Sequence, residues 1–292
     1  MNTRSKPLPS SGTLFILNSM QWPVTTRDLA PGDGKSAKLD LAHFDLARIR
    51  SFDDPLFEEA YGWLWREFGP KDEMERREVL ARRFQLDPRF YYEMAYVRVD
   101  GEFVAVRDHT AAMTRDGLSV VVHLSHNLVS PLARRTGLAG WMRALPIAAA
   151  RQCVLANDAP LLVFTPITLL AEMEYPRPDD PPRTIRLQAY ERAGFRKIDP
   201  HMVKYFQPDF RDPAVIDATG GARPLPFQLL VRRVNREHER CIFGAELQQL
   251  VETLYDIYRP QFRAADLAHP SLSLDSYPAD DAMIPLVPPT QC

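Results

Sequence analysis

The most constraining feature of this sequence is a run of three strand-like segments joined by two Asp-Gly pairs. The segments cover residues 92–99, 102–115 and 118–129. The pairs Asp100-Gly101 and Asp116-Gly117 lie between them. Asp-Gly between alternating runs is the strongest short-range hairpin signal, because tight hairpin turns need residues that tolerate positive φ. The sequence therefore predicts an antiparallel meander of three strands.

Helical and strand-like patterns flank this meander on both sides. Apolar residues at a spacing of three and four indicate helices, and short apolar or alternating runs indicate strands. The sequence predicts a strand within 39–51, a helix beginning at Asp53 or Asp54, helices over 72–84 and 137–157, a strand over Leu161–Phe164, a helix over 184–193, strands over 197–206 and 227–234, and a helix within 237–258. The meander is thus one part of a longer alternation of helices and strands.

Proline is abundant and glycine is scarce in this chain. Of 292 residues 26 are Pro and 13 are Gly, whereas ~5% Pro and ~7% Gly are typical. The prolines cluster near the start, in an insertion over 166–182, and after Pro260, where we expect extended chain. The sequence predicts a weakly structured N-terminal arm (1–38), a core domain (39–236), and a C-terminal helix with a proline-rich tail (237–292).

Charge and cysteine content exclude several classes of protein. The 36 basic and 38 acidic residues give a formal charge of -2, which argues against a nucleic-acid binder. Cys153, Cys241 and Cys292 are too far apart to indicate a pair or a metal site, which suits a reducing compartment. No signal peptide and no apolar run of ~20 residues is visible. We therefore expect a soluble, cytoplasmic protein that does not bind a membrane.

The stretch from Leu128 to Ala139 is the most informative for chemistry. It leaves the third strand of the meander and turns directly into the next helix. Such a loop offers backbone N–H groups and the positive end of a helix dipole to an anion. Gly137 and Ala139 lack bulk, and Arg134 and Arg135 add charged donors. The sequence therefore predicts an anion site, most simply for a pyrophosphate.

The charge of the surrounding segment agrees with an anionic ligand. Residues 117–157 contain no Asp or Glu and four Arg, although the average acid content would give about five acids in 41 residues. A locally positive segment in a nearly neutral protein attracts anions. A buried strand and helix would exclude acids as well, so this alternative stays open.

Two motifs in this region and downstream resemble those of the GNAT acyltransferase superfamily. Residues 134–139, R-R-T-G-L-A, fit its R/Q-x-x-G-x-G/A signature between a strand and a helix. Residues 190–195, Y-E-R-A-G-F, are similar to the Y-E-K-x-G-F segment that closes its fourth helix. The order of predicted elements is also similar, so the resemblance covers roughly two thirds of the chain. It implies an α+β fold of three layers, with a mixed, mostly antiparallel central sheet flanked by helices.

The resemblance also implies an activity and a set of roles. The chain would be an N-acyltransferase that uses acetyl-CoA as co-substrate, without a metal, and a small-molecule or peptide amine would attack the thioester directly. Leu128 and Val129 would bond the pantetheine arm, and Tyr190 would protonate the leaving thiolate. The loop that would hold the pyrophosphate of coenzyme A consists of Arg134, Arg135, Thr136, Gly137, Leu138 and Ala139.

Two departures from the family pattern stand out. Arg183 occupies the position where the family usually has an Asn that contacts the cofactor. Pro146 lies inside the predicted cofactor helix, where proline costs about 3 kcal/mol.

A general base and an acceptor site are also needed. His126 is favoured as the base over His123 and His109, because it is nearest to the expected thioester; a structural role is the alternative for each. The acids of the insertion would attract a cationic amine, or would form a solvated surface; they are Glu172, Glu174, Asp179 and Asp180.

Two other functions remain open at this point. The chain could be a catalytically inactive GNAT-fold protein that binds coenzyme A as a sensor or partner-binding module. Alternatively, the loop could bind another phosphate ligand and the resemblance would be accidental. The amphipathic helix around 243–258 could pack on the core or on a second subunit, so a homodimer is possible.

Overall fold

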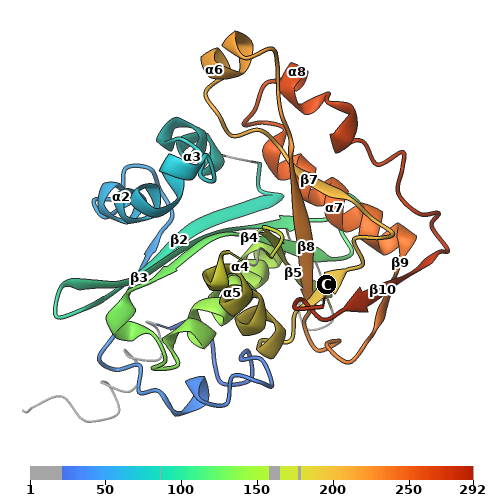
Figure 1. Ribbon diagram of the computed structural model, residues 1–292. Coiled ribbons are helices and arrows are strands. Elements are labelled where there is room, and N and C mark those ends of the chain that lie inside the picture. Colours follow the sequence, from blue (N-terminus) through green and yellow to red (C-terminus); the bar gives the residue numbers. More distant parts are fainter. Residues whose placement is uncertain (1–21, 86, 158–164, 177–178, 292) are drawn as a thin grey trace, which may run out of the picture.

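The computed structural model describes residues 22–85, 87–157, 165–176 and 179–291. Strands β1 to β10 and helices α2 to α8 follow one another along the chain (Figure 1). The strands are β1 (Asp45–Ile49), β2 (Phe90–Val99), β3 (Glu102–Met113), β4 (Val120–Val129), β5 (Ile167–Met173), β6 (Arg196–Ile198), β7 (Tyr205–Gln207), β8 (Leu225–Arg233), β9 (Cys241–Phe243) and β10 (Met283–Val287). The α-helices are α2 (Phe57–Phe68), α3 (Arg77–Arg83), α4 (Leu138–Ala156), α5 (Pro181–Arg192), α6 (Pro213–Ala218), α7 (Gly244–Tyr258) and α8 (Ala264–Leu267); short 3-10 helices include Ser36–Lys38 and Pro131–Ala133.

One mixed sheet organises the molecule. Its strand order is β1-β2-β3-β4-β5-β8-β6-β10-β9, and β7 pairs with β8 beside this path. Every pairing among the described strands is antiparallel except that of β4 with β5. The fold class is therefore α+β with a mixed, mostly antiparallel central sheet flanked by helices, which confirms the sequence-based prediction.

The meander forms where the Asp-Gly pairs predicted it. Asp100 and Gly101 have φ values of 52° and 83°, as a tight hairpin between β2 and β3 requires. The second turn is longer: Gly117 has a φ of 69°, and Asp116 accepts hydrogen bonds from the backbone of Leu118 and the hydroxyl of Thr114. Local turn chemistry thus accounts for the two connections of the meander.

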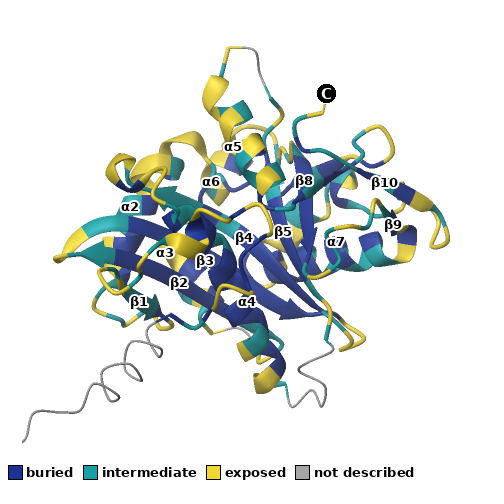
Figure 2. Cartoon of the chain, turned by 90° about the horizontal axis from the view of Figure 1, so that it is seen from below, coloured by how far each residue is buried: buried dark blue, intermediate teal, exposed yellow. Residues whose placement is uncertain are grey.

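Helices cover both faces of the sheet, and the alternation along β3 shows which helices share a face. Ala111 packs in a cluster with residues of α4 and α5. Val106 and Ala112 point the opposite way. Val106 packs with α2 and α3, and Ala112 packs with α7. Hence α4 and α5 cover one face, and α2, α3 and α7 cover the other. The strands between these layers are mostly buried (Figure 2).

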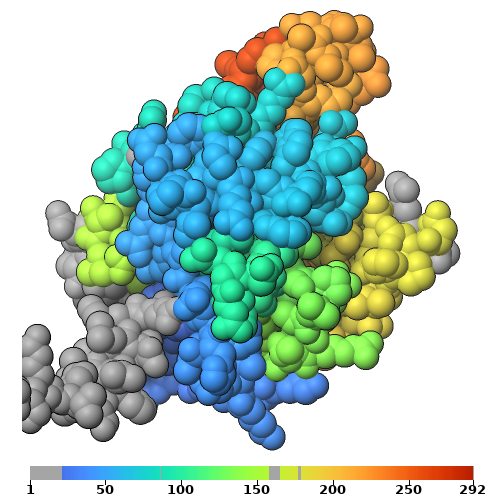
Figure 3. Space-filling view, turned by 90° about the vertical axis from the view of Figure 1, so that its left-hand side faces the viewer, coloured from blue at the N-terminus to red at the C-terminus, as the bar shows by residue number. Residues whose placement is uncertain are grey.

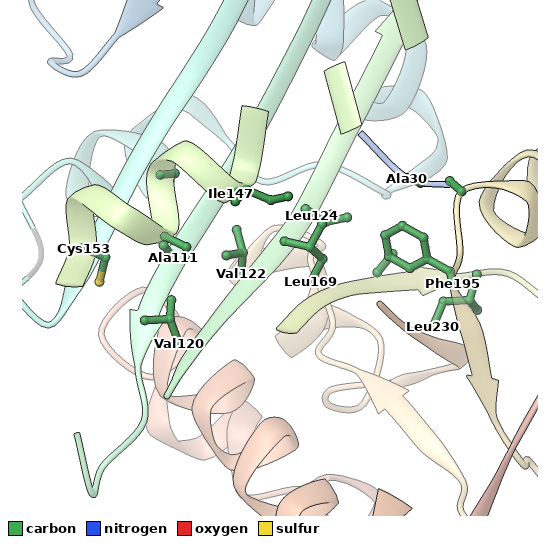
Figure 4. Packing of buried hydrophobic residues seen from close by; sticks show 14 of the residues in the cluster. Ala30, Ala111, Val120, Val122, Leu124, Ile147, Cys153, Leu169, Phe195 and Leu230 are labelled. Carbon is green, nitrogen blue, oxygen red and sulfur yellow. The ribbon is translucent and has the colours of Figure 1, made fainter. Parts of the chain in front are cut away.

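The core under α4 is apolar and closely packed. Val120, Val122 and Leu124 of β4 lie below Ile147 and Cys153 of the helix (Figure 4). Pro146 is accommodated inside α4 and is itself buried. This packing explains how a helix with an interior proline is retained, because most helical stability in proteins comes from tertiary contacts.

The strand between α4 and α5 differs from the prediction. The sequence placed it at Leu161–Phe164, which lies outside the described residues, and assigned residues 166–182 to an insertion. The structure instead forms β5 at Ile167–Met173. Pro166 precedes the strand, and its carbonyl accepts from the N–H of Val120 at 2.9 Å. A proline just before the first residue of a strand removes no hydrogen bond between the strands. The prediction that an irregular insertion begins at Pro166 was therefore wrong.

Two further segments form more regular structure than the sequence indicated. The single strand predicted over 197–206 is divided into β6 and β7. The region over 237–292 supplies β9 and β10 to the main sheet, with β10 between β6 and β9.

Within the described ranges, no helix is both long and apolar enough to cross a membrane.

Candidate active site at the point where β4 and β5 separate

The parallel strands β4 and β5 separate part of the way along their length. Their pairing runs from Val120 with Ile167 to His123 with Leu170 and ends there. β4 continues to Val129 and β5 to Met173. Among the described residues, no strand pairs with the remainder of β4 on this side. The two strands therefore form a V whose vertex is at His123.

A β-bulge lies directly at this vertex. Thr110 of β3 pairs with His123 and Asp108 pairs with His126, so that Leu124 and Ser125 together stand opposite one residue, His109. A bulge shifts the alternation of the strand that carries it.

The bulge changes which face each residue of β4 meets. Before it, Val122 packs on the α4 side; after it, Leu128 packs on the α2 side, although both residue numbers are even. His123 and His126 consequently face the same layer: the ring of His123 lies against Tyr258 of α7 and that of His126 against Phe68 of α2.

His123 belongs to a hydrogen-bonded cluster at the vertex. Its Nε2 lies 2.8 Å from Oε2 of Glu172, and its Nδ1 lies 3.2 Å from Oγ of Ser125. Glu172 also accepts from Tyr258, at 2.7 Å, and from Tyr205. Burial raises the pKa of Glu172, but the hydrogen bonds from His123, Tyr205 and Tyr258 outweigh this effect and hold the pKa below its ordinary value. We refer to Ser125, His123 and Glu172 as the vertex cluster.

The location of Glu172 corrects the sequence-based prediction. The acid was expected on a proline-rich surface insertion, but it lies in β5 and its side chain is only 4% exposed. Glu174 lies just after the strand and forms ion pairs with Arg186 at 2.9 Å and Arg183 at 3.5 Å. Arg183, at the position of the family's Asn, also pairs with Asp180 at 2.7 Å. The insertion acids Glu172, Glu174 and Asp180 are thus buried or engaged with arginines, rather than forming one solvated acidic surface.

His126 has a different environment from His123. Its Nδ1 lies 2.8 Å from Oδ1 of Asp108, and its Nε2 lies 2.9 Å from the carbonyl oxygen of Glu73. Burial lowers the pKa of His126, but the charge and hydrogen bond of Asp108 outweigh it and raise the pKa to about 9. The imidazole therefore carries two protons at neutral pH and donates from both nitrogens, which leaves neither nitrogen free to accept a proton from a substrate.

The loop that the sequence marked as an anion site lies on the surface at the open end of the V. Arg134, Arg135 and Thr136 are exposed, and α4 begins at Leu138. Arg135 and Gly137 have φ values of 67° and 109°, so the loop bends sharply into the helix. The loop residues lie on the same face of the molecule as α2 and the β2–β3 hairpin (Figure 3).

The N-terminal arm packs beside this loop. Ser36 accepts from Nε1 of Trp141 at 2.8 Å, and Asp33 pairs with Arg143 at 2.7 Å. A Cβ at Gly137 would lie 3.0 Å from Cα of Ser36, so glycine is needed for this approach. Residues 22–38 are therefore packed against α4, which corrects the prediction of a weakly structured arm for this part; residues 1–21 lie outside the described ranges.

Tyr190 lies on the other face of the sheet from the vertex cluster. Its ring packs edge to face on Phe195, with centroids 4.9 Å apart. It also interacts with Arg107 of β3, whose side chain is fully buried and donates to the carbonyl of Met142 at 3.5 Å. Burial lowers the pKa of Arg107 and the neighbouring Tyr190 opposes this shift. The sequence did not indicate Arg107, because a lone Arg in a strand has no local pattern.

A cavity of about 430 Å³ opens between the loop and α2. The rings of Trp63 and Phe103 stack at 4.1 Å along its wall, and Leu128, Ser130 and Arg134 line the side toward the loop. Its wall thus combines aromatic and apolar groups with four charged side chains, which are Arg66, Glu67, Glu102 and Arg134. The described residues contain no group of three or more His, Cys, Asp or Glu arranged to hold a metal ion.

Comparisons with known proteins return similarities of structure only. No family model and no curated protein sequence matches this chain. An acetyltransferase from Thermus thermophilus is 18% identical with a TM-score of 0.33, over 67% of this chain and 99% of that one. An acyl-CoA N-acyltransferase from Pseudomonas aeruginosa is 18% identical with a TM-score of 0.34, over 65% and 99%. A tandem GNAT protein from the clavulanic acid biosynthesis pathway is 14% identical with a TM-score of 0.32, over 83% and 97%.

The topology itself carries the conclusion about the fold. A strand and two helices precede a three-stranded meander, and a helix, a parallel strand, another helix and further antiparallel strands follow. The parallel pair β4 and β5 separates after His123, and β4 continues to the loop that opens α4. This arrangement of elements is a GNAT-like fold.

Proposed function

We propose that this protein is an acyl-CoA-dependent N-acyltransferase that moves an acyl group, most simply acetyl, to a primary amine. The observation that carries the proposal is the separation of β4 from β5 next to a helix-opening loop. An extended pantetheine arm can bond to the free edge of β4, as an added strand would. The loop and the dipole of α4 then receive the pyrophosphate.

The placement of the loop residues supports the roles proposed for them. Arg134 and Arg135 are exposed, so their guanidinium groups can reach phosphate oxygens. The backbone of Thr136, Gly137, Leu138 and Ala139 lies at the positive end of α4. Leu128 and Val129 would bond the pantetheine arm.

Acyl transfer needs an acid for the thiolate and a base for the amine. Tyr190 is the proposed acid, and the neighbouring guanidinium of Arg107 would stabilise the phenolate that forms. The sequence favoured His126 as the base. Because both nitrogens of His126 are occupied by acceptors, we assign the base role to His123 instead, whose Nδ1 contacts only a hydroxyl.

The acceptor would be an amine of a small molecule or peptide. The aromatic cavity beside Trp63 and Phe103 is next to the loop and can receive an apolar part of it. Glu174 is still proposed to attract the ammonium group, and it also pairs with Arg186 and Arg183. We retain cytoplasmic location, independence from metal ions, and a possible homodimer as parts of this proposal.

Calorimetry with coenzyme A, followed by thiol release from acetyl-CoA with a panel of amines, tests the proposal. Gly137→Glu should abolish binding, because it adds a carboxylate beside the proposed phosphate site; its Cβ would also meet Ser36 of the arm, so thermal unfolding must show that the fold is retained. Gly221→Glu is the matched control: Gly221 has a φ of 108°, against 109° for Gly137, but lies in open surroundings far along the chain. Equal affinity of both variants and the parent would contradict the proposal.

A second candidate is a coenzyme A-binding sensor without catalysis. It is favoured by the nearly complete burial of His123 and Glu172 under Tyr258, which restricts access of an acceptor. Binding of coenzyme A without turnover of any amine in a broad panel would support this alternative. Turnover that Tyr190→Phe reduces would support the enzyme.

A further inference from the structure

The vertex cluster has the connectivity of a catalytic triad. Oγ of Ser125 lies 3.2 Å from one ring nitrogen of His123, and the other ring nitrogen lies 2.8 Å from Glu172. A hydroxyl, an imidazole and a carboxylate joined in this order activate a nucleophile in several unrelated folds. Because Glu172 comes from a different strand, no pattern in the sequence signals this chemistry.

The hydrogen-bond partners set the protonation of the ring. Glu172 is ionised and can only accept, so Nε2 of His123 carries the proton that it shares with the carboxylate. In the neutral ring Nδ1 then has a lone pair, and the hydroxyl of Ser125 donates to it. This tautomer is the one in which the imidazole can remove a proton from the serine.

The carboxylate is itself held in place by the layer formed by β7 and α7. Tyr205 and Tyr258 donate to it, and Nε2 of Gln207 lies 3.4 Å from it. These donors leave Glu172 little freedom to turn away from His123. Tyr205, Tyr258 and Gln207 are thus positioning residues for the cluster.

Serine is the accessible end of this chain of hydrogen bonds. The side chains of His123 and Glu172 are only 3% and 4% exposed, whereas Ser125 is half-buried. Ser125 lies in the bulge, just beyond the last residue of β4 that pairs with β5. A molecule entering the V therefore meets the hydroxyl before it meets the imidazole.

The length of β4 separates Ser125 from the loop. Val129, where the loop begins, is four positions beyond Ser125 in the sequence, which corresponds to about 13 Å at the ~3.3 Å rise of a strand. A ligand whose phosphates sit on the loop and whose arm follows β4 would bring its far end to Ser125. In acyl-CoA that end carries the thioester.

We propose that Ser125 is a nucleophile that accepts the acyl group before the amine does. Its oxygen attacks the thioester carbonyl while the hydroxyl proton passes to Nδ1 of His123. The C–S bond breaks, and the thiolate takes that proton and leaves, which forms free coenzyme A and an acyl-serine ester. The amine then attacks this ester, the bond from carbon to Oγ breaks, and the amine proton returns to the serine oxygen through His123.

This inference rests on the proposed function for its acyl donor, and it replaces direct attack with two successive transfers. The nucleophile can be tested without that donor. An activated ester such as p-nitrophenyl acetate delivers the same acetyl group and needs no phosphate site. Labelling by the ester therefore tests the vertex cluster, and labelling by acetyl-CoA tests the donor as well.

The experiment is intact-mass measurement and peptide mapping after incubation with either donor in the absence of an amine. We expect one acetyl group on the peptide that contains Ser125, and its loss in Ser125→Ala. Ser119→Ala is the control, since Ser119 is a half-buried serine just before the other end of β4 that contacts Thr114. Glu172→Gln should slow labelling at least tenfold without changing the peptide that is labelled. Thermal unfolding of each variant checks that the fold is retained.

The outcomes separate the two proposals. Labelling of Ser125 by both donors supports both. Labelling by the ester alone supports the nucleophile and contradicts coenzyme A as donor. If neither donor labels Ser125, the inference is overturned; amine acetylation that survives in Ser125→Ala would then leave the proposed function standing with direct attack.

Discussion

The two faces of β4 differ in the side chains that they bury near the vertex, although the neighbouring strands also bury Glu93, Arg107 and His109 on the α4 side. Under α4, β4 presents Val120, Val122 and Leu124 to an apolar cluster. Under α2, α3 and α7, the strands present charged and polar groups; these include His123, His126, Asp108 and Glu172, with Glu75 and Arg83 beside them. Buried polar groups are costly unless every partner is present.

This difference separates residues that stabilise the fold from residues that carry the chemistry. The face under α4 holds the fold together by burial, and it brings the loop to the helix N-terminus. The opposite face carries groups whose protonation matters, and they are held by hydrogen bonds from elements far away in the sequence. Substitutions on the two faces should therefore fail in different ways.

The largest effect is expected from the buried ion pair on the polar face. Arg83 and Glu75 contact each other with side chains 0% and 1% exposed. Glu75→Ala leaves the buried charge of Arg83 without its counter-charge and with only the neutral acceptor Gln261, which should lower the free energy of unfolding by about 3–5 kcal/mol. Denaturant unfolding measures this. Glu67→Ala is the control, because its pair with Lys71 is about half exposed and exposed pairs contribute at most about 1 kcal/mol.

A smaller loss should follow from the apolar face. Leu124→Ala removes a buried side chain below α4 and should cost about 3 kcal/mol of unfolding free energy, from lost transfer energy and a cavity. Leu118→Ala, at a position 71% exposed, should change almost nothing. If the folded Leu124→Ala protein were also much less active per molecule than the parent, the apolar face would act in the chemistry as well.

The histidines of the two faces should titrate in opposite directions. Burial lowers the pKa of His126, but Asp108 outweighs it and brings the pKa to about 9. His109 lies on the α4 side, 3.2 Å from Glu93, and burial lowers its pKa below the ordinary value. Proton NMR of the ring signals should resolve the two, and similar pKa values for both would remove this difference between the faces.

The raised pKa of His126 has a consequence for stability. A group whose pKa is higher in the folded state stabilises the protein fully below its unfolded pKa of about 6.5 and loses that contribution as pH rises. The free energy of unfolding should therefore fall between the unfolded pKa and a pH of about 9. His126→Gln should flatten this slope, and an unchanged slope in that variant would assign the titration to another group.

The smallest effect concerns an acid at the edge of the V. Glu174 pairs with Arg186 at a partly exposed position, so Glu174→Gln should change the unfolding free energy by less than about 1 kcal/mol. If Glu174 attracts the amine, KM for a cationic acceptor should rise several-fold while kcat stays the same. Asp179→Asn serves as the control, since Asp179 is exposed. An equal KM shift in both variants would indicate a general charge effect.

Several elements could be predicted from local sequence because their causes are local. Asp100-Gly101 specifies a tight hairpin through its own φ preferences, and the alternation of the flanking strands follows. The loop before α4 was visible because Gly137 and the two arginines stand between a strand and a helix. Pro166 was misleading, since its effect depends on whether its carbonyl or its missing N–H faces the neighbouring strand.

The sequence by itself determined the central meander, the loop with its helix, and the two motifs that resemble an acyltransferase family. Only the tertiary structure decided which of the candidate residues meet. One extra residue in β4 turns His123 and His126 to the same face, and Glu172, Tyr205 and Tyr258 reach the vertex from three other elements. Turn and helix signals are short-range interactions within a few residues. The vertex cluster is assembled across the sheet, where register and layer packing, rather than local propensity, fix the geometry.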